Sequence, residues 1–255
     1  MTRVLAAEAR KLLATSSSRR LIAAGPLLAA GVSVLVLVIG TSGKGGLRVE
    51  GVVTQIRSDA DLRDFATLAA ATTFLALALG VTEATSEFRY ATIVRAMLAR
   101  PRRWETVVAK AVVITMGGAV LTLTATLACF VVAAVWLVAH GQDVPMGGRS
   151  AVVLLELAVT GGLDAAAGAA VGFLVRNQAT ALVVVLGWAF LAESMIAGLF
   201  IAAKPWLPVT GAAQAMLSGP AEHLFTPLAG GLLLAVYALA LTAFAAVALQ
   251  RRDVG

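Results

Sequence analysis

The chain has 255 residues, of which 60% are hydrophobic and only 13% are charged. A soluble domain of this composition could not cover its surface with polar groups, because ordinary soluble domains carry about 25% charged residues. Lipid is therefore the expected solvent for most of the chain. The net charge of +6 would suit nucleic-acid binding. However, the basic residues flank apolar segments, as they do in membrane proteins, so we expect no nucleic-acid partner.

The first predicted element, within residues 1–20, is an amphipathic helix that lies along a membrane surface. Its basic residues, among them Arg10 and Lys11, share one face. The opposite face is apolar and carries Leu5, Ala9, Leu12 and Leu13. This pattern is typical of a helix at the headgroup layer of an anionic lipid bilayer.

Six apolar segments follow, each about as long as the ~20 residues that cross ~30 Å of hydrocarbon as a helix. They cover residues 21–40, 65–82, 111–139, 151–175, 178–203 and 227–249. Only short connections separate them, so the sequence predicts an all-α membrane protein with a single transmembrane domain over residues 1–255.

The distribution of Lys and Arg predicts the orientation of these spans. Fourteen of the 20 basic residues fall on the side that holds both chain ends, and six fall on the other side. Because the more basic side of a membrane protein faces the cytoplasm, we expect both termini to be cytoplasmic.

The largest cytoplasmic connection is expected between spans two and three, at residues 83–110. Within it, an apolar stripe at helical spacing comprises Ile93, Val94, Met97 and Leu98. Pro101 disfavours helix at the residue before it and ends the segment. The sequence thus predicts a short amphipathic helix presented to the cytoplasm.

Two acidic residues, Asp164 and Glu193, lie near the middle of spans four and five. Each costs about 2.5–3.5 kcal/mol on membrane-insertion scales, so each is expected to face protein or water rather than lipid. Two interpretations stay open: a hydrogen bond between helices, or a substrate-facing or proton-linked site. Gly168 and Gly172 form a G-x-x-x-G pair beside Asp164, which predicts close packing of a neighbouring helix.

The motifs of several enzyme classes are missing from the sequence. It has no G-x-x-x-x-G-K-[ST] phosphate loop, so we expect no nucleotide hydrolysis by this chain itself. His140 and His223 are far apart and lack metal-ligand spacing. The run Gly40–Gly43, GTSG, has no histidine base near its serine. We therefore expect no catalytic residues, no metal and no cofactor in this chain.

Two stretches, EARKL at Glu8–Leu12 and TEATSEFRYATIVRAMLARPRRWETVVAK ending at Lys110, resemble the permease subunits of type-2 ATP-binding-cassette exporters. The second is similar to that family's order of an acidic residue, an aromatic-basic pair, Gly-Thr, a short apolar helix, Pro-Arg and a Lys that opens span three. Ala91 departs from this pattern, which commonly has Gly there. The matching residues are Glu87, Phe88, Arg89, Thr92, Pro101, Arg102 and Lys110.

This resemblance implies a coupling helix between spans two and three that docks onto a separate cytosolic ATPase, which would hold the ATP and Mg²⁺. It also implies a second permease copy, a bacterial plasma membrane, and export of a hydrophobic or amphipathic substrate such as a drug, antibiotic or lipid. Two alternatives stay open. One is a proton-coupled secondary carrier using Asp164 and Glu193, and the other is a membrane immunity or scaffold protein that transports nothing.

Overall fold

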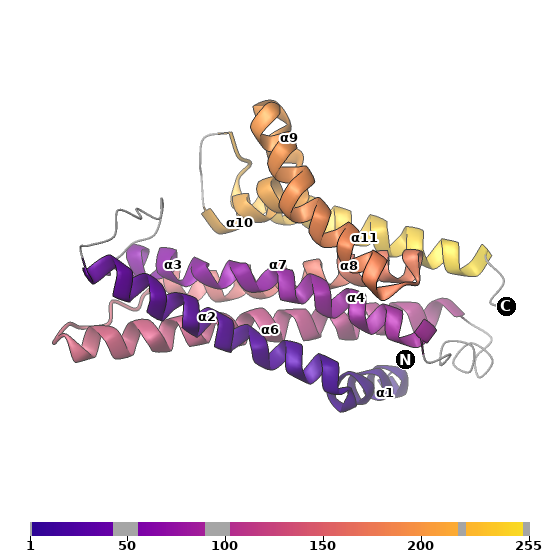
Figure 1. The fold of residues 1–255 in the computed structure, drawn as a ribbon, viewed down its shortest axis with the longest axis horizontal. Coiled ribbons are helices and arrows are strands. Elements are labelled where there is room, and N and C mark those ends of the chain that lie inside the picture. The colour runs from indigo at the N-terminus through magenta and orange to yellow at the C-terminus, as the bar shows by residue number, and fades with distance from the viewer. Residues whose placement is uncertain (1, 43–55, 90–102, 219–222, 252–255) are drawn as a thin grey trace.

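The computed structural model describes residues 2–42, 56–89, 103–218 and 223–251 (Figure 1). Throughout these ranges the regular elements are helices. Six helical segments are long and apolar enough to cross a membrane, which confirms the predicted all-α membrane fold. The six candidate spans are Ser16–Ile39, Asp59–Arg89, Val108–Ala139, Gly148–Val175, Gln178–Leu199 and Pro227–Leu249.

Several of these spans contain more than one helical element. In chain order the elements are α1 (Thr2–Ala14), α2 (Ser16–Ser42), α3 (Asp59–Ala66), η1 (Thr67–Thr72), α4 (Thr73–Arg89), α6 (Arg103–Ala139), α7 (Gly148–Val175), α8 (Gln178–Gly187), η2 (Trp188–Ala192), α9 (Glu193–Leu199), η3 (Ile201–Trp206), η4 (Pro208–Ala213), α10 (Gln214–Ser218) and α11 (Pro227–Arg251).

The second span is longer than the apolar run 65–82 predicts. It extends from Asp59 to Arg89 through α3, η1 and α4. A capping box begins it: the Ser58 side chain accepts the Asp61 backbone N–H, and the Asp61 carboxylate accepts the Ser58 N–H. The helix continues past residue 82 because acidic side chains in its last turns find partners inside the molecule.

The helices on both sides of the expected cytoplasmic loop extend into it. Residues 83–89 belong to α4, and residues 103–110 belong to α6. The expected coupling helix itself falls outside the described residues. The expected site residues that lie there are Thr92, Ile93, Val94, Met97, Leu98, Pro101 and Arg102.

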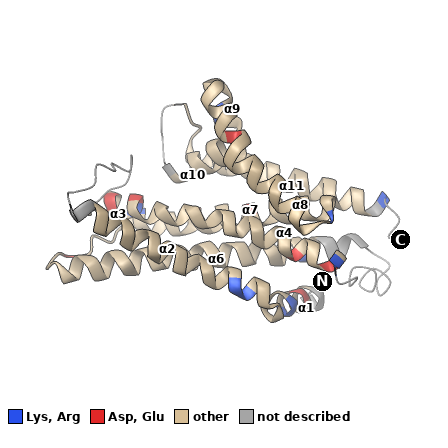
Figure 2. Cartoon of the chain, viewed as in Figure 1, with Lys and Arg blue, Asp and Glu red and all other residues tan. Residues whose placement is uncertain are grey.

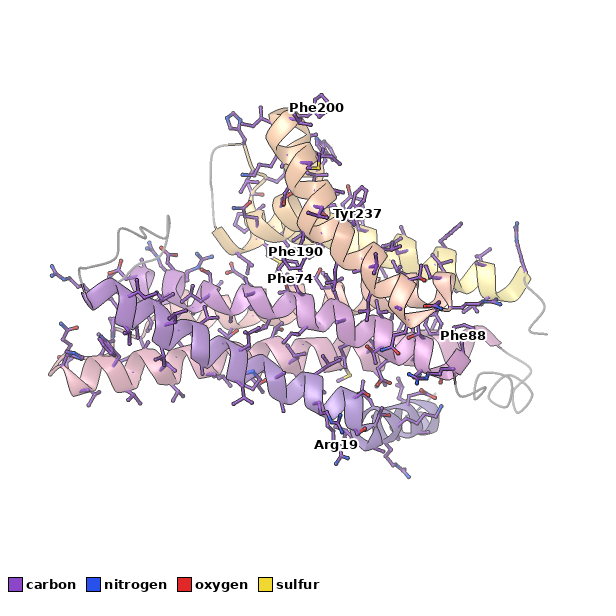
Figure 3. The ribbon with its side chains drawn as sticks, in the orientation of Figure 1. Arg19, Phe74, Phe88, Phe190, Phe200 and Tyr237 are labelled. Carbon is purple, nitrogen blue, oxygen red and sulfur yellow. The ribbon has the colours of Figure 1, made fainter. Side chains whose placement is uncertain are left out.

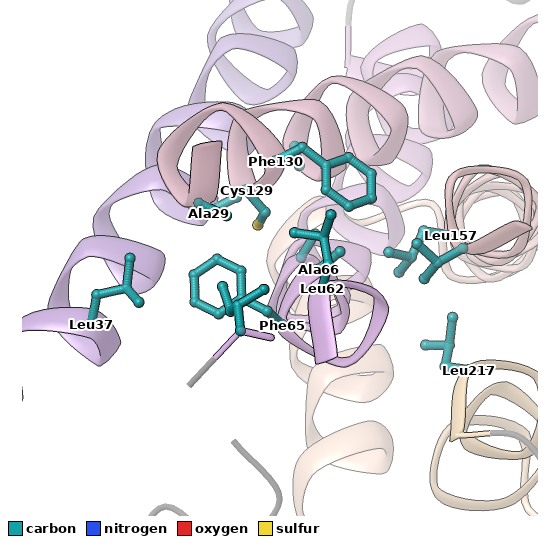
Figure 4. Packing of buried hydrophobic residues seen from close by; sticks show 14 of the residues in the cluster. Ala29, Leu37, Leu62, Phe65, Ala66, Cys129, Phe130, Leu157 and Leu217 are labelled. Carbon is teal, nitrogen blue, oxygen red and sulfur yellow. The ribbon is translucent and has the colours of Figure 1, made fainter. Parts of the chain in front are cut away.

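Helices α2, α4, α6 and α7 pack into a long bundle, and α1 crosses one end of it (Figure 1). Near the other end, Phe65 and Leu62 are fully buried among Ala29, Cys129 and Leu157 (Figure 4). The lone cysteine thus packs in the core, as its apolar surroundings in the sequence predict. Its Sγ accepts a hydrogen bond from the Ser33 hydroxyl at 3.2 Å.

Glycines allow the bundle helices to approach one another closely. A Cβ atom at Gly80 of α4 would lie 2.0 Å from the backbone oxygen of Ala165 on α7. At Gly168 of α7 it would lie 2.2 Å from the backbone oxygen of Leu77 on α4. The small residues around Asp164 therefore pack helices within one chain, as the sequence pattern predicts.

The later part of the chain forms an arm beside this bundle. The segment α8–η2–α9 leaves the bundle at an angle, and α11 packs along α7 (Figure 1). Between α9 and α11 the chain turns back, and η4 and α10 pack against α11. These residues lie between the fifth and sixth predicted spans, yet Ala212 and Ala213 are buried. Pro208 suits the first turn of η4 because a proline lacks the N–H that would stay unpaired there.

Candidate functional site: a buried charge cluster and an acidic cavity

Four charged side chains meet where α1 crosses the end of the bundle. They are Glu8 and Lys11 of α1, Glu87 of α4 and Lys110 of α6, and we call this group the charge clasp. Charged residues of the described chain gather mainly toward the two ends of the bundle (Figure 2). The charge clasp lies at the end where α1, the last turn of α4 and the start of α6 come together.

Each lysine of the charge clasp contacts both glutamates. The Lys110 Nζ lies 2.9 Å from Glu87 Oε1 and 3.4 Å from Glu8 Oε2. The Lys11 Nζ lies 2.7 Å from Glu8 Oε1 and 3.5 Å from Glu87 Oε1. Two positive and two negative groups therefore balance within one cluster, and removal of any one of them leaves a net charge among the others.

Most of the charge clasp is buried. Lys110 is 4% exposed, Glu87 5% and Glu8 6%, whereas the Lys11 side chain is 48% exposed. Taking ions out of water costs several kcal/mol each unless they pair closely. The reciprocal contacts offset that cost, and they make Lys110 the central cation of the cluster.

A second acidic residue of α4 extends the charge clasp to α2. Glu83 lies one turn before Glu87, so both side chains face the same side of the helix. The Glu83 carboxylate accepts a short hydrogen bond from the Ser18 hydroxyl of α2. Helices α1, α2, α4 and α6 are thus tied together by polar contacts at one end of the bundle.

Phe88 and three arginines of the described chain, Arg10, Arg89 and Arg176, lie around this end. Phe88 packs edge-on against Phe173 of α7, with ring centroids 6.3 Å apart. The guanidinium carbon of Arg176, at the α7–α8 junction, sits 5.3 Å from the centroid of the Phe88 ring. Arg10 and Arg89 are exposed. The charge clasp therefore gathers Glu8, Lys11 and Glu87 of the expected site residues.

The charge clasp changes the proton affinity of Lys11. Partial burial lowers the pKa of this side chain, but the hydrogen bond and charge of Glu8, then those of Glu87, outweigh that effect and raise the pKa above its usual 10.5. Lys11 therefore stays positively charged at every physiological pH.

A separate buried acid lies in the arm. Glu193 at the start of α9 is 0% exposed, and its carboxylate accepts four hydrogen bonds. Trp188 Nε1 donates to one oxygen at 2.9 Å. The other oxygen accepts the backbone N–H groups of Val209 and Thr210, each at 2.8 Å, and the Thr210 hydroxyl at 3.2 Å.

The local fold explains this arrangement. Residues Trp188–Ala192 form a π-helical turn, in which the Glu193 N–H bonds to the Trp188 carbonyl five residues back. Such a turn brings residues i and i+5 to the same side of the helix, so the indole of Trp188 reaches the carboxylate. Val209 and Thr210 supply the free N–H groups of the first turn of η4. Glu193 thus caps the segment that folds back beside it.

The structure brings Asp164 and Glu193 to one cavity. This space of about 580 Å³ lies between α4, α7, α11 and the arm, and we call it the acidic cavity. Asp164 of α7 is 3% exposed and lines it together with Glu193. The Thr73 side chain lies within hydrogen-bonding reach of the Asp164 carboxyl group. Both intramembrane acids therefore face protein, as their insertion cost predicts.

No known protein family, curated protein or solved structure matches this chain. The geometry above is therefore the basis for any functional conclusion. In the part of the chain that the structure describes, no three His, Cys, Asp or Glu residues come together as metal ligands.

Sequence reasoning missed the partners of the acids rather than the acids themselves. Ser18 and Thr73 are ordinary hydroxyl residues in apolar segments, and nothing in their local sequence marks them. The sequence does mark the segment in which the chain turns back between α9 and α11. Pro205 and Pro208 end one helix and begin another, and a short run of small apolar residues follows. That run is too short to span a membrane and too apolar for a solvent loop.

Proposed function

We propose that this chain is the membrane-spanning permease subunit of an ATP-binding-cassette exporter. A separate cytosolic ATPase would bind at residues 90–102, and the spans of this chain, with those of a second permease copy, would form the pathway. The substrate would be a hydrophobic or amphipathic molecule, and the membrane a bacterial plasma membrane with both chain termini inside.

The observation that carries this proposal is the position of the charge clasp. Glu87 lies three residues before the segment 90–102, and Lys110 lies eight residues after it. The 2.9 Å contact between them closes the base of that segment, and Glu8 and Lys11 fix the base to α1. A force on residues 90–102 would therefore move α1, α4 and α6 together rather than bend one helix alone.

Burying the charged groups of the charge clasp costs free energy of desolvation, and a mechanical role would explain why they are kept. Replacing a buried ion group with apolar side chains of similar volume is often neutral or stabilising. An apolar cluster would join the same helices without the desolvation cost. Our proposal is that the ion pairs are kept because their directed contacts hold the three helices in one arrangement, as a coupling joint between an ATPase and a pathway needs.

The test is co-purification of a partner from native membranes in mild detergent. The sequence predicts that Met97 lies on the docking stripe, so Met97→Glu is expected to abolish recovery of a cytosolic ATPase that the unaltered chain brings down. Met146→Glu is the matched control, because Met146 is 66% exposed in the connection at the opposite end of the bundle. Recovery of the same ATPase with the Met97 variant contradicts the proposal.

The alternative of a proton-coupled carrier makes the opposite prediction. Sealed vesicles that contain only this chain would then accumulate substrate on a pH gradient without ATP. The four donors to Glu193 count against a proton-carrying role for that residue, because each of them requires the carboxylate as an acceptor.

A scaffold or immunity protein would leave the ATP turnover of a co-purified ATPase unchanged by lipophilic compounds.

A further inference from the structure

The acidic cavity has the size and lining of a small-molecule site. Its volume of about 580 Å³ falls in the range of pockets that hold drug-sized ligands. Most lining residues are apolar, and Trp188, Trp206 and Tyr237 add aromatic rings. The Tyr237 hydroxyl donates to the Trp206 carbonyl at 2.7 Å, which joins α11 to η3 and fixes this part of the wall.

Aromatic contacts also join the arm to the bundle beside the cavity. The rings of Phe74 on α4 and Phe190 in the π-helical turn stack with centroids 4.1 Å apart (Figure 3). Trp188 and Trp206 remain 48% and 59% exposed at the arm. A ligand dissolved in the lipid could therefore reach the aromatic side of the cavity without crossing water.

The two acids in this cavity differ in how their oxygens are used. The Glu193 oxygens accept hydrogen bonds from Trp188, Val209 and Thr210, so this side chain stabilises the fold of the arm. Asp164 has the Thr73 side chain beside it. Across the described residues, no Lys, Arg or His forms an ion pair with Asp164. The Asp164 carboxyl group is therefore the acid in the cavity that is left to interact with a ligand.

These charges select among ligands. An anion would lie unfavourably beside two acidic side chains, whereas a bound cation would favour the ionised form of Asp164. An organic cation would supply the counter-charge of that form, while its apolar body would fill the rest of the cavity. The rings of Trp188 and Tyr237 would add cation–π attraction.

We propose that the acidic cavity binds a monovalent organic cation with a bulky apolar or aromatic body, with its charge facing Asp164. The inference rests on the proposed function in one respect, because it names the class of molecule that the permease would carry. The binding itself needs no ATPase.

The experiment compares two probes of the same shape and opposite charge. The full-length protein is placed in phosphatidylcholine nanodiscs, and equilibrium binding of tetraphenylphosphonium and tetraphenylborate is measured, with empty nanodiscs subtracted for partition into lipid. Saturable binding of the phosphonium, with quenching of tryptophan fluorescence, is expected. The borate is expected to bind no more than it does to empty discs.

Three variants locate the site. Asp164→Asn is expected to weaken phosphonium binding by about thirtyfold or more, as when one partner of a buried charge pair is removed. Asp164→Glu keeps the charge and is expected to keep saturable binding. Asp143→Asn removes the same group from an exposed connection far from the cavity and is expected to bind as the unaltered chain does.

Equal binding of the two probes would overturn the inference, as would unchanged phosphonium affinity in Asp164→Asn. If the Asn variant does not fold, the contrast between the probes and the behaviour of Asp164→Glu still decide. The binding assay contains no ATPase, so a negative result in it does not affect the co-purification test of the proposed function. A negative co-purification result likewise does not affect the conclusion from the binding assay.

Discussion

The bundle and the arm of this molecule differ in how much of their apolar surface is buried within the chain. The apolar windows of the spans that contain α4, α6 and α7 are 56%, 44% and 61% buried within the chain, whereas those of α2, α8–α9 and α11 are only 22%, 17% and 22% buried. Gly80 and Gly168 of the bundle lie against neighbouring backbones, as does Gly211 where the chain folds back, but around Gly187 of α8 and Gly198 of α9 the structure has open space. The centre of the bundle, α4, α6 and α7, is therefore held by close contact between helices, and α8 and α9 of the arm present their sides to whatever surrounds the chain.

Buried charge follows the same division. In the bundle, Glu87 is balanced by Lys110 and Lys11, so charge meets charge. In the arm, Glu193 is balanced by N–H and O–H donors from Trp188 and the start of η4. The first arrangement joins three helices, α1, α4 and α6. The second holds one chain segment beside its neighbour, which suits a part with few other contacts.

The largest effect is expected from breaking the charge clasp at its centre. Lys110→Met leaves Glu8 and Glu87 buried with only the half-exposed Lys11 near them, and we expect a loss of about 3–5 kcal/mol in unfolding free energy. Thermal unfolding of the purified protein in detergent measures this. Lys11→Met is the matched control in the same cluster, and equal losses in the two variants would contradict the central role of Lys110.

A smaller effect is expected from glycine substitutions, which compare the two regions directly. Gly80→Ala places a methyl group 2.0 Å from the Ala165 carbonyl oxygen, so α4 and α7 must separate. We expect a cost of about 1–3 kcal/mol, as for other overpacked cores. Gly187→Ala meets nothing within 4 Å in the arm, and it is expected to stabilise the helix by up to about 1 kcal/mol. If the unfolding midpoints of Gly80→Ala and Gly187→Ala shift in the same direction, the expected difference in packing between the bundle and the arm is wrong.

The smallest effect concerns Lys11 and pH. Its pKa is raised in the folded protein, so the folded state holds the proton more tightly than the unfolded state. The resulting stability is present below the unfolded pKa and is lost as pH rises through the folded pKa. Because Lys11 is half-exposed, Lys11→Met is expected to cost at most about 1 kcal/mol at neutral pH. The difference in melting temperature between this variant and the unaltered chain should shrink above about pH 10.5. A constant difference from neutral to alkaline pH would argue against the contacts of Lys11 with Glu8 and Glu87.

The sequence predicts the spans well because long apolar runs need no distant partner to be identified. It cuts the second span short because Glu83 and Glu87 look like the end of a helix when only neighbouring residues are considered. Their partners come from Ser18, Lys11 and Lys110, which are brought together only in the folded chain. The pattern of neighbouring residues in the sequence cannot predict such contacts between distant residues.

The intramembrane acids illustrate the same limit. Insertion cost alone predicts that Asp164 and Glu193 face protein or water, and the structure agrees. That they share one cavity, and that Glu193 caps η4, depends on the chain folding back after α9. The two prolines of that segment, Pro205 and Pro208, indicate a break in the helix but not the direction that the chain takes.

The π-helical turn Trp188–Ala192 gives span five one surplus residue in a single turn. Such an insertion can travel along a helix by exchanging hydrogen bonds one at a time, and no stretch needs to unwind. Each residue that the insertion passes would change its register by one position, which turns that residue by about 100° around the helix axis. The hydrogen bond from the Trp188 indole to Glu193 joins the two ends of this turn and so favours its present position in the span.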